Sequence, residues 1–129
     1  AARPRLLAAT QSAGANLVTL SGDSHNGWAF DLAHDGRAAG VEFAGQSVTS
    51  GGFETYTPAP PATVAAALRA ANPGLKWVDT SKRGYMKVSL TPVRASSAWR
   101  LWDNVRTAEA GMSSEVTQSV DHGRNQLTA

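Results

Sequence analysis

Short apolar runs separated by turn-forming residues are the feature that most constrains the fold of this chain. Strand-like runs occupy residues 17–20, 28–32, 39–43, 75–78, 84–90 and 98–102, and a weaker run covers residues 115–120. Runs of this length, bounded by Gly, Pro, Asn or Asp, are typical of β-strands. Asp35-Gly36 lies between the second and third runs and favours the positive φ angles of a tight hairpin turn. The sequence therefore predicts paired, largely antiparallel strands.

Two helices are predicted beside these strands. The first covers residues 4–10, with Pro4 near its start and Gly14 after its end, and the second covers residues 62–71. The Asn72-Pro73-Gly74 sequence stops the second helix. Val64, Leu68 and Ala71 share one of its faces, so this helix is expected to cover a sheet. The expected fold class is α/β, or α+β by strict count.

Composition narrows the possible functions. The 129 residues make one domain or part of one, and the 42% of apolar residues suffice for a core. The net charge is only +2 and the basic residues are scattered, which argues against nucleic-acid binding driven by electrostatics. The lack of cysteine removes disulfides, zinc–thiolate sites and thiol nucleophiles, but leaves oxygen and imidazole ligands. No apolar run approaches the roughly 20 residues that span a bilayer, so we expect a soluble chain.

The segment Gly22-Asp23-Ser24-His25-Asn26-Gly27 carries the most chemical information. It follows a buried strand, and residues two apart in extended backbone point to the same side, so the side chains of Asp23 and His25 are expected to converge. A carboxylate can bridge two cations, and a neutral imidazole offers one nitrogen to a cation or a hydrogen bond to a phosphate oxygen. The pair could serve a binuclear metal site, whereas the motif alone also occurs in ordinary surface loops.

Hydrolysis of a phosphate ester is a reaction that needs such ligands. Attacking and leaving oxygens both carry charge in the in-line displacement, and two cations about 3.5–4 Å apart stabilise both oxygens and make hydroxide available near neutral pH. Asp23 would hold these cations, and the two flanking glycines would let the backbone turn tightly close to a substrate.

Four stretches in one order, residues 17–28, 41–50, 72–77 and 83–88, resemble the PhoD-like alkaline phosphatase family. The resemblance extends from about residue 2 to residue 102. It implies a metallophosphatase fold, a four-layer α-β-β-α sandwich with mixed strands, and hydrolysis of phosphate mono- or diesters at a metal centre. Relatives are described with iron and calcium, and they are commonly exported to the periplasm or secreted.

The resemblance assigns roles to two residues. Asp23 matches the family's Gly-Asp-x-His motif and is the expected metal ligand, and His25 is the expected second site residue, which binds metal or contacts phosphate during catalysis. The family's other metal ligands and its phosphate-contacting Arg are not recognisable before Asp23, and no phosphate-binding residue is assigned. We therefore expect residues 1–129 to form the carboxy-terminal portion of such a domain, inactive or nearly so alone. Its exposed strand edges and one apolar sheet face are expected to pack against the missing amino-terminal part or against a copy of itself.

Several other residues allow two interpretations each. Residues 49–52 could bind an anion through backbone N–H groups or simply connect two elements, and Glu42 could orient a metal-bound His or be an ordinary strand residue. Arg83 and Tyr85 could donate hydrogen bonds to phosphate or serve packing and strand-edge solvation. The remaining candidates are expected to be solvated histidines or core aromatics, with Trp28 also a possible pocket wall: His34, His122, Trp28, Trp77, Trp99 and Trp102.

A second function from a different class stays open at this point. The incomplete ligand set is also compatible with a non-catalytic, β-rich binding or interaction module in which Asp23 and His25 are incidental. Metal content and activity toward a phosphate ester separate the two hypotheses.

Overall fold

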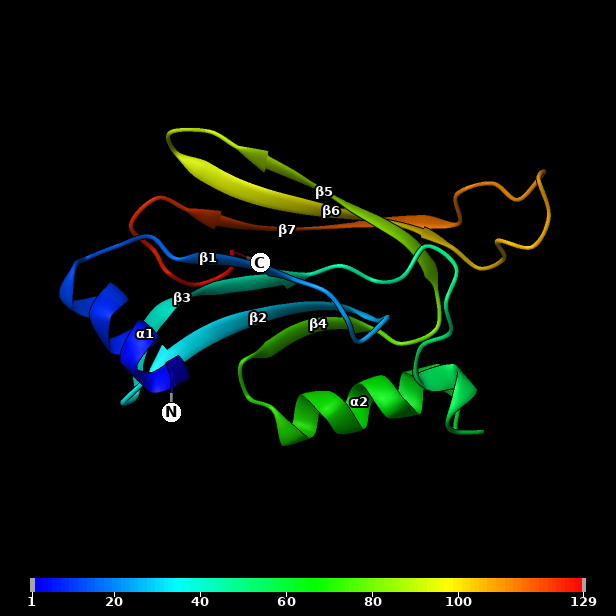
Figure 1. Ribbon diagram of the computed structural model, residues 1–129, viewed down its shortest axis with the longest axis horizontal. Coiled ribbons are helices and arrows are strands. Elements are labelled where there is room, and N and C mark those ends of the chain that lie inside the picture. The colour runs from blue at the N-terminus through cyan, green and yellow to red at the C-terminus, as the bar shows by residue number, and fades with distance from the viewer. Residues whose placement is uncertain (1, 129) are drawn as a thin grey trace.

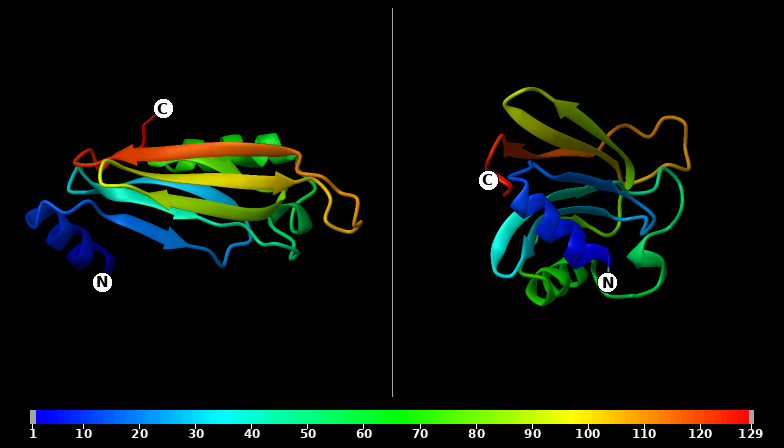
Figure 2. Two further views of the ribbon diagram at one scale, coloured as in Figure 1. Left: turned by 90° about the horizontal axis from the view of Figure 1, so that it is seen from above. Right: turned by 60° about the vertical axis from the view of Figure 1, so that its left-hand side comes forward.

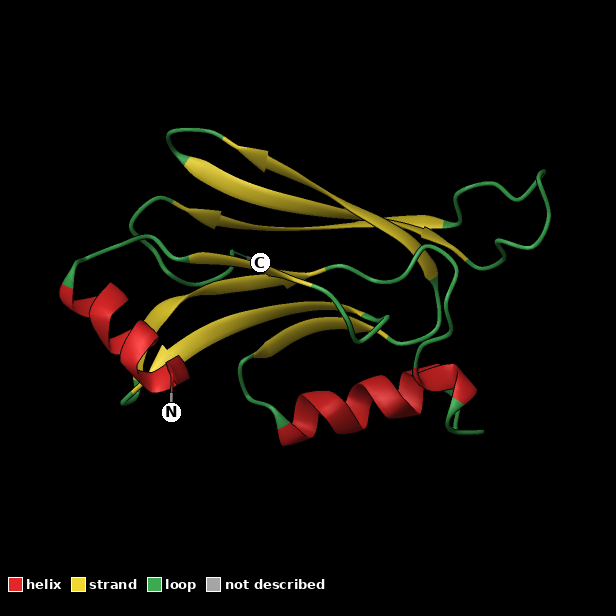
Figure 3. Cartoon of the chain, viewed as in Figure 1, coloured by secondary structure: helices red, strands yellow, loops and turns green. Residues whose placement is uncertain are grey.

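The computed structural model describes residues 2–128 and consists mainly of two β-sheets (Figures 1 and 3). The elements in chain order are α1 (Ala2–Ser12), β1 (Val18–Ser21), β2 (Gly27–His34), β3 (Arg37–Ala44), the 3₁₀ turn η1 (Phe53–Thr55), α2 (Pro61–Ala71), β4 (Leu75–Asp79), β5 (Arg83–Leu90), β6 (Arg94–Trp102) and β7 (Ser114–Asp121). The mixed α/β class expected from the sequence is confirmed.

The first sheet has the strand order β1-β3-β2-β4. β1 pairs parallel with β3, and the other two pairings are antiparallel. Asp35 and Gly36 join β2 to β3 with φ angles of 50° and 72°, the left-handed conformations that a two-residue hairpin requires. Because β3 lies between β1 and β2, the chain that leaves β1 must cross the end of β3 before β2 can begin. The Asp23 segment makes this crossing.

The second sheet is an antiparallel meander in the order β5-β6-β7. It packs face to face on the first sheet, and the buried core between them consists of Ala29, Val41, Phe43, Trp99, Leu101 and Val120. Trp99 is central, since its ring lies 4.7 Å from Trp77 and 5.7 Å from Phe43, centroid to centroid. Its Nε1 donates a hydrogen bond of 2.8 Å to the Ala44 carbonyl, which ties the second sheet to the end of β3.

Both helices lie on the face of the first sheet that points away from the second sheet (Figures 1 and 2). Leu7 of α1 is buried against Leu32 and Ala39. On α2, Val64 and Leu68 are half-buried as predicted, but Ala71 is exposed, because the helix packs on β4 and ends there. Residues 2–128 therefore supply a helical layer and two sheets of the expected sandwich. None of the helices in this part of the chain is long and apolar enough to cross a membrane.

The outer face of the second sheet is polar. The prediction that this chain has an unpaired apolar sheet face is therefore wrong. Alternation along the strands turns Met86, Trp99 and Val116 inward, and the residues between them outward. The outward set includes Tyr85, Lys87, Arg100, Glu115 and Thr117. Arg100 donates to Glu115 at 2.7 Å and to the Tyr85 hydroxyl at 3.1 Å, which are contacts of a solvated face. Exposed apolar side chains occur instead in the loops and on the two edge strands β1 and β5, where Leu20 and Leu90 are exposed.

Candidate functional site

Residues 22–26 form a tight turn that carries Asp23 and His25 over the end of β3. Asp23 has a φ of 70° and His25 a φ of 62°, so both adopt the left-handed conformation. The prediction that extended backbone would bring their side chains to one side is therefore wrong in its premise. Left-handed residues are needed because the chain must turn sharply to pass a neighbouring strand. Both side chains are exposed at this end of the sheet.

The ring of His25 is held by the loop that follows β3. Its Nδ1 lies 2.9 Å from the carbonyl oxygen of Gly51. A carbonyl oxygen only accepts hydrogen bonds, so Nδ1 carries the proton. In the neutral ring the lone pair then belongs to Nε2, the nitrogen that points away from the loop contact. This tautomer is the one that metal-binding histidines adopt when a carbonyl orients them.

Asn26 fixes the turn from beneath, a role that the sequence did not reveal. Its side chain is buried, with 2% of its surface exposed. Its Oδ1 accepts a hydrogen bond from the Phe53 amide at 3.1 Å, and its Nδ2 donates to the Ser24 carbonyl at 2.5 Å. Gly52 makes the contact possible, because a Cβ at this position would lie 2.3 Å from Asn26 Oδ1. An Asn after the motif His, with a Gly-Gly pair further on, is a common pattern. It therefore did not predict that the Asn26 side chain holds the turn.

An ion pair between a buried arginine and a more exposed glutamate supports the same loop from its other side. Arg83, at the start of β5, is 7% exposed and pairs with Glu54, whose Oε1 also accepts from the Gly52 amide at 3.1 Å. Burial lowers the pKa of the Arg83 guanidinium, the direction expected for a cation withdrawn from water. Arg83 also donates to the Lys82 carbonyl at 2.8 Å. With these partners it serves packing, the second of the two interpretations that its sequence allowed.

Two N–H groups in the loop of residues 47–52 bond to a side chain of the same loop. The amides of Thr49 and Ser50 both donate to Ser47 Oγ, at 3.2 Å and 2.8 Å. These donors are therefore not aimed outward at an anion, and the loop is a connecting element that carries Gly51 and Gly52 to the turn. A hollow of about 340 Å³ lies beside the loop, lined by Thr49, Gly51 and Arg83 among others, but not by Asp23 or His25.

Trp28 and Glu42 stabilise the surroundings of the turn. Trp28 is half-buried and donates from Nε1 to Ser24 Oγ at 2.6 Å, and its ring system packs nearly perpendicular to the Phe53 ring, 6.0 Å between centroids. It therefore braces the turn and stays outside the core between the sheets. Glu42 accepts a hydrogen bond of 2.5 Å from Ser21, the last residue of β1, and so acts as a strand residue without contacting His25.

The other candidates lie away from the turn. Tyr85 and Trp102 pack together on the outer face of the second sheet, 5.9 Å apart, so Trp102 is not the core residue that was expected. Trp77 and Trp99 belong to the core as expected. His34 lies beside the hairpin turn, 3.6 Å from Asp35, and His122 is exposed, with its Nδ1 3.0 Å from Asn16 Nδ2.

The donor set of this turn does not complete a metal site. Within residues 2–128, no three side chains from His, Cys, Asp and Glu come close enough together to hold a metal ion. Asp23 and His25 offer oxygen and nitrogen donors suited to hard or borderline cations, but two donors cannot fill the coordination shells of two such ions. Any metal held here needs further ligands.

Two comparisons with known proteins point to the same family. The family model described as PhoD-like phosphatase matches residues 1–99. A solved structure of PhoD superposes with a TM-score of 0.80 and 25% sequence identity, covering 98% of this chain and 24% of the PhoD chain. A search of curated proteins found no match. The present chain thus spans about a quarter of the PhoD chain that it matches. Sequence and fold lead to one conclusion: this chain belongs to the PhoD-like phosphatase family.

Proposed function

We propose that this chain takes part in hydrolysis of phosphate mono- or diesters, as the carboxy-terminal portion of a PhoD-like catalytic domain whose metal site other residues complete. The observation that carries the proposal is the turn of residues 22–26, where two potential ligands are exposed while Asn26 and Gly51 fix the backbone and the imidazole. Membership of the family, which is generally metal-dependent, supports the reaction type.

Asp23 and His25 have distinct roles in this proposal. The Asp23 carboxylate binds a metal ion, and its exposure leaves both oxygens free to do so. His25 presents Nε2 as a metal ligand or, when protonated, as a donor to a phosphate oxygen. A bound metal centre, with iron and calcium as the candidate ions, would supply positive charge for the phosphoryl group and a source of hydroxide. Export to the periplasm or to the exterior belongs to the same proposal, because the family is typically exported.

Asp23→Asn in the complete protein tests the proposal most directly. Asn tolerates left-handed backbone as Asp does, so the substitution removes the charge without straining the turn. We expect turnover of p-nitrophenyl phosphate and of bis-p-nitrophenyl phosphate to fall at least 100-fold, with the melting temperature unchanged. Asp35→Asn is the matched control, since Asp35 is also exposed with a positive φ of 50°, and activity is expected to stay the same. Retained turnover in Asp23→Asn would count decisively against the proposal.

The incomplete donor set favours a second candidate, a non-catalytic β-rich interaction module. The two candidates differ in metal content. The proposed hydrolase binds iron or calcium in the complete protein and loses metal on His25→Asn, which also tolerates the positive φ at this position. A complete protein that contains no metal and cleaves neither phosphate ester selects the interaction module.

A further inference from the structure

The two long sides of the β-sandwich differ in how the space between the sheets is covered. On the side of β4 and β7, the segment after β7 closes the space between the sheets (Figure 2). Leu127 packs against the core, and its amide donates to Asp31 Oδ1 at 2.8 Å. The Thr128 amide donates to the Ser119 carbonyl at 2.7 Å and so extends the pairing of β7. This side has both an apolar plug and a partner for its strand edge.

On the opposite side, formed by β1 and β5, residues 2–128 supply no such plug, and the loop after β3 pairs with the edge of β5 only at Gly84. Val18 and Leu20 of β1 align with Val41 and Phe43, which are core residues, so both face the space between the sheets. On β5 the inward residues are Met86, Val88 and Leu90. Yet Leu20 is 54% exposed and Leu90 is 72% exposed. We call the five residues Val18, Leu20, Met86, Val88 and Leu90 the open seam.

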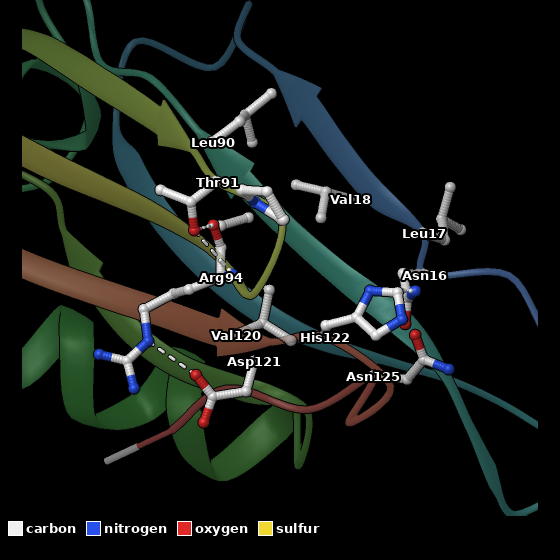
Figure 4. Close-up of a pocket in the computed structure, with 12 residues that line it drawn as sticks. Asn16, Leu17, Val18, Leu90, Thr91, Arg94, Val120, Asp121, His122 and Asn125 are labelled. Atoms are coloured by element: carbon white, nitrogen blue, oxygen red, sulfur yellow. Dashed lines mark hydrogen bonds and ion pairs between the residues drawn. The ribbon is translucent and has the colours of Figure 1, made fainter.

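A hollow at one end of the open seam reaches the core. It has a volume of about 250 Å³, and Val18 and Leu90 line it from the two sheets while Val120 of the core contributes to its wall (Figure 4). Polar pairs lie at its rim, including Arg94 with Asp121 at 2.7 Å. The core is therefore continuous with the open seam, and apolar side chains inserted there would extend it.

Within residues 2–128, the backbone groups that Val18, Leu20, Met86 and Val88 direct to the free edges also lack partners. The carbonyls of Leu17 and Ser21 accept hydrogen bonds from β3 and from the residue just after it, so the alternate residues Val18 and Leu20 direct their N–H and C=O groups to the free edge. On β5, the Gly84 amide bonds to the Ser47 carbonyl across the free edge, which places the backbone groups of Met86 and Val88 on that same edge. Exposed strand edges are usually blocked by prolines or charges. β1 carries neither, and β5 has Lys87 as its one charge beyond Arg83.

We propose that the open seam is an interface for the remaining part of a PhoD-like chain, which adds one strand to β1, one strand to β5, and apolar side chains between them. This inference rests on the proposed function, since it identifies the partner that completes the domain. The solved PhoD chain favours this occupant over a second copy, because it contains this fold within a chain about four times as long. Its other three quarters are long enough to supply both strands.

Binding of the complementary PhoD chain tests the interface. The probe is the PhoD chain of the solved structure with the segment that matches this chain removed, co-expressed with this chain. We expect a one-to-one complex in which the amides of Leu20 and Val88 exchange hydrogen at least 100-fold more slowly than in the isolated chain. If the separate pieces do not associate, this chain is inserted into the gap as a covalent chimaera and the same amides are measured. Fast exchange in both forms overturns the proposal.

Leu20→Lys and Leu6→Lys provide matched variants. The two leucines are similarly exposed, at 54% and 56%, but Leu6 lies on α1 outside the open seam. We expect Leu20→Lys to weaken the complex at least tenfold and Leu6→Lys to change it less than twofold, with both isolated variants melting like the parent chain. Equal weakening by the two variants would refute the assignment. So would a homodimer of the isolated chain that already protects the Leu20 and Val88 amides, because a second copy would then be the occupant.

The outcome can be separated from that of the proposed function. Complex formation and hydrogen exchange are read without any turnover, so a protected seam in a complex that cleaves no phosphate ester refutes the hydrolase and leaves the interface standing. If instead the complex shows turnover that depends on Asp23 while the amides of Leu20 and Val88 still exchange fast, the proposed interface is refuted and the proposed hydrolase is not.

Discussion

Replacing Asn26 by alanine should loosen the turn that carries Asp23 and His25 and lower the stability of the chain measurably. The substitution removes the bonds from the Phe53 amide and to the Ser24 carbonyl, at 3.1 Å and 2.5 Å. Each such bond contributes about 0.5–1.5 kcal/mol net, and a polar group left buried without a partner costs about 1–3 kcal/mol. The Phe53 amide is partly buried and loses its partner while the buried Asn26 side chain is also removed, so we expect the free energy of unfolding to fall by about 2–4 kcal/mol.

Thermal unfolding by circular dichroism and hydrogen exchange of the Phe53 amide measure this effect together. For a chain of this size, 1 kcal/mol corresponds to roughly 3–5 °C in melting temperature, so Asn26→Ala should melt on the order of 10 °C lower. The exchange rate of the Phe53 amide should rise by more than the global loss of stability explains, because the loop detaches locally.

Asn16→Ala is the control for this prediction. The Asn16 side chain also has two hydrogen-bond partners, His122 Nδ1 and the backbone amide of Gly123, but it is exposed, so water replaces it when it is removed. We expect a loss below about 1 kcal/mol. If Asn26→Ala were no more destabilising than Asn16→Ala, the conclusion that the buried Asn26 side chain holds the turn would be refuted.

Two further predictions concern parts of the fold away from the turn. Gly84→Ala should destabilise the chain by more than about 3 kcal/mol or prevent folding, because φ is 146° and a Cβ would lie 1.9 Å from the Arg100 carbonyl oxygen. Denaturant unfolding measures this loss. The control is Gly111→Ala, which should leave the denaturant midpoint unchanged because nothing lies within 4 Å of the added Cβ. The hydrogen bond from Arg94 lowers the pKa of Asp121, so this pair should stabilise the fold above the unfolded-state pKa of about 3.9 and lose that contribution as the pH falls through the folded-state pKa. Carbon-detected NMR titration should give Asp121 a pKa below its ordinary value in the parent and an ordinary value in Arg94→Gln, and equal pKa values in the two would contradict the pairing.

The secondary structure could be predicted from the sequence because its signals are local. Apolar alternation within residues 84–90 and the Asp35-Gly36 turn depend on side chains only a few positions apart, and the structure has β5 and the β2–β3 hairpin at those places. Trp102 shows where alternation becomes insufficient. It belongs to the same strand as Trp99, but three positions further along it faces the opposite side of the sheet, where Tyr85 covers it.

For the candidate site too, some features could be predicted from the sequence and others depended on the tertiary structure. The sequence by itself identified Asp23 and His25, since the motif and its chemistry are contained in four consecutive residues. Only the tertiary structure decided their conformation, because the order β1-β3-β2 forces the intervening turn across a strand that follows later in the chain. It also decided that Gly51 orients His25, that Asn26 supports the loop from within, and that Arg83 is neutralised by Glu54. Each of these contacts joins residues more than 20 positions apart in the sequence. A local sequence pattern therefore cannot predict them.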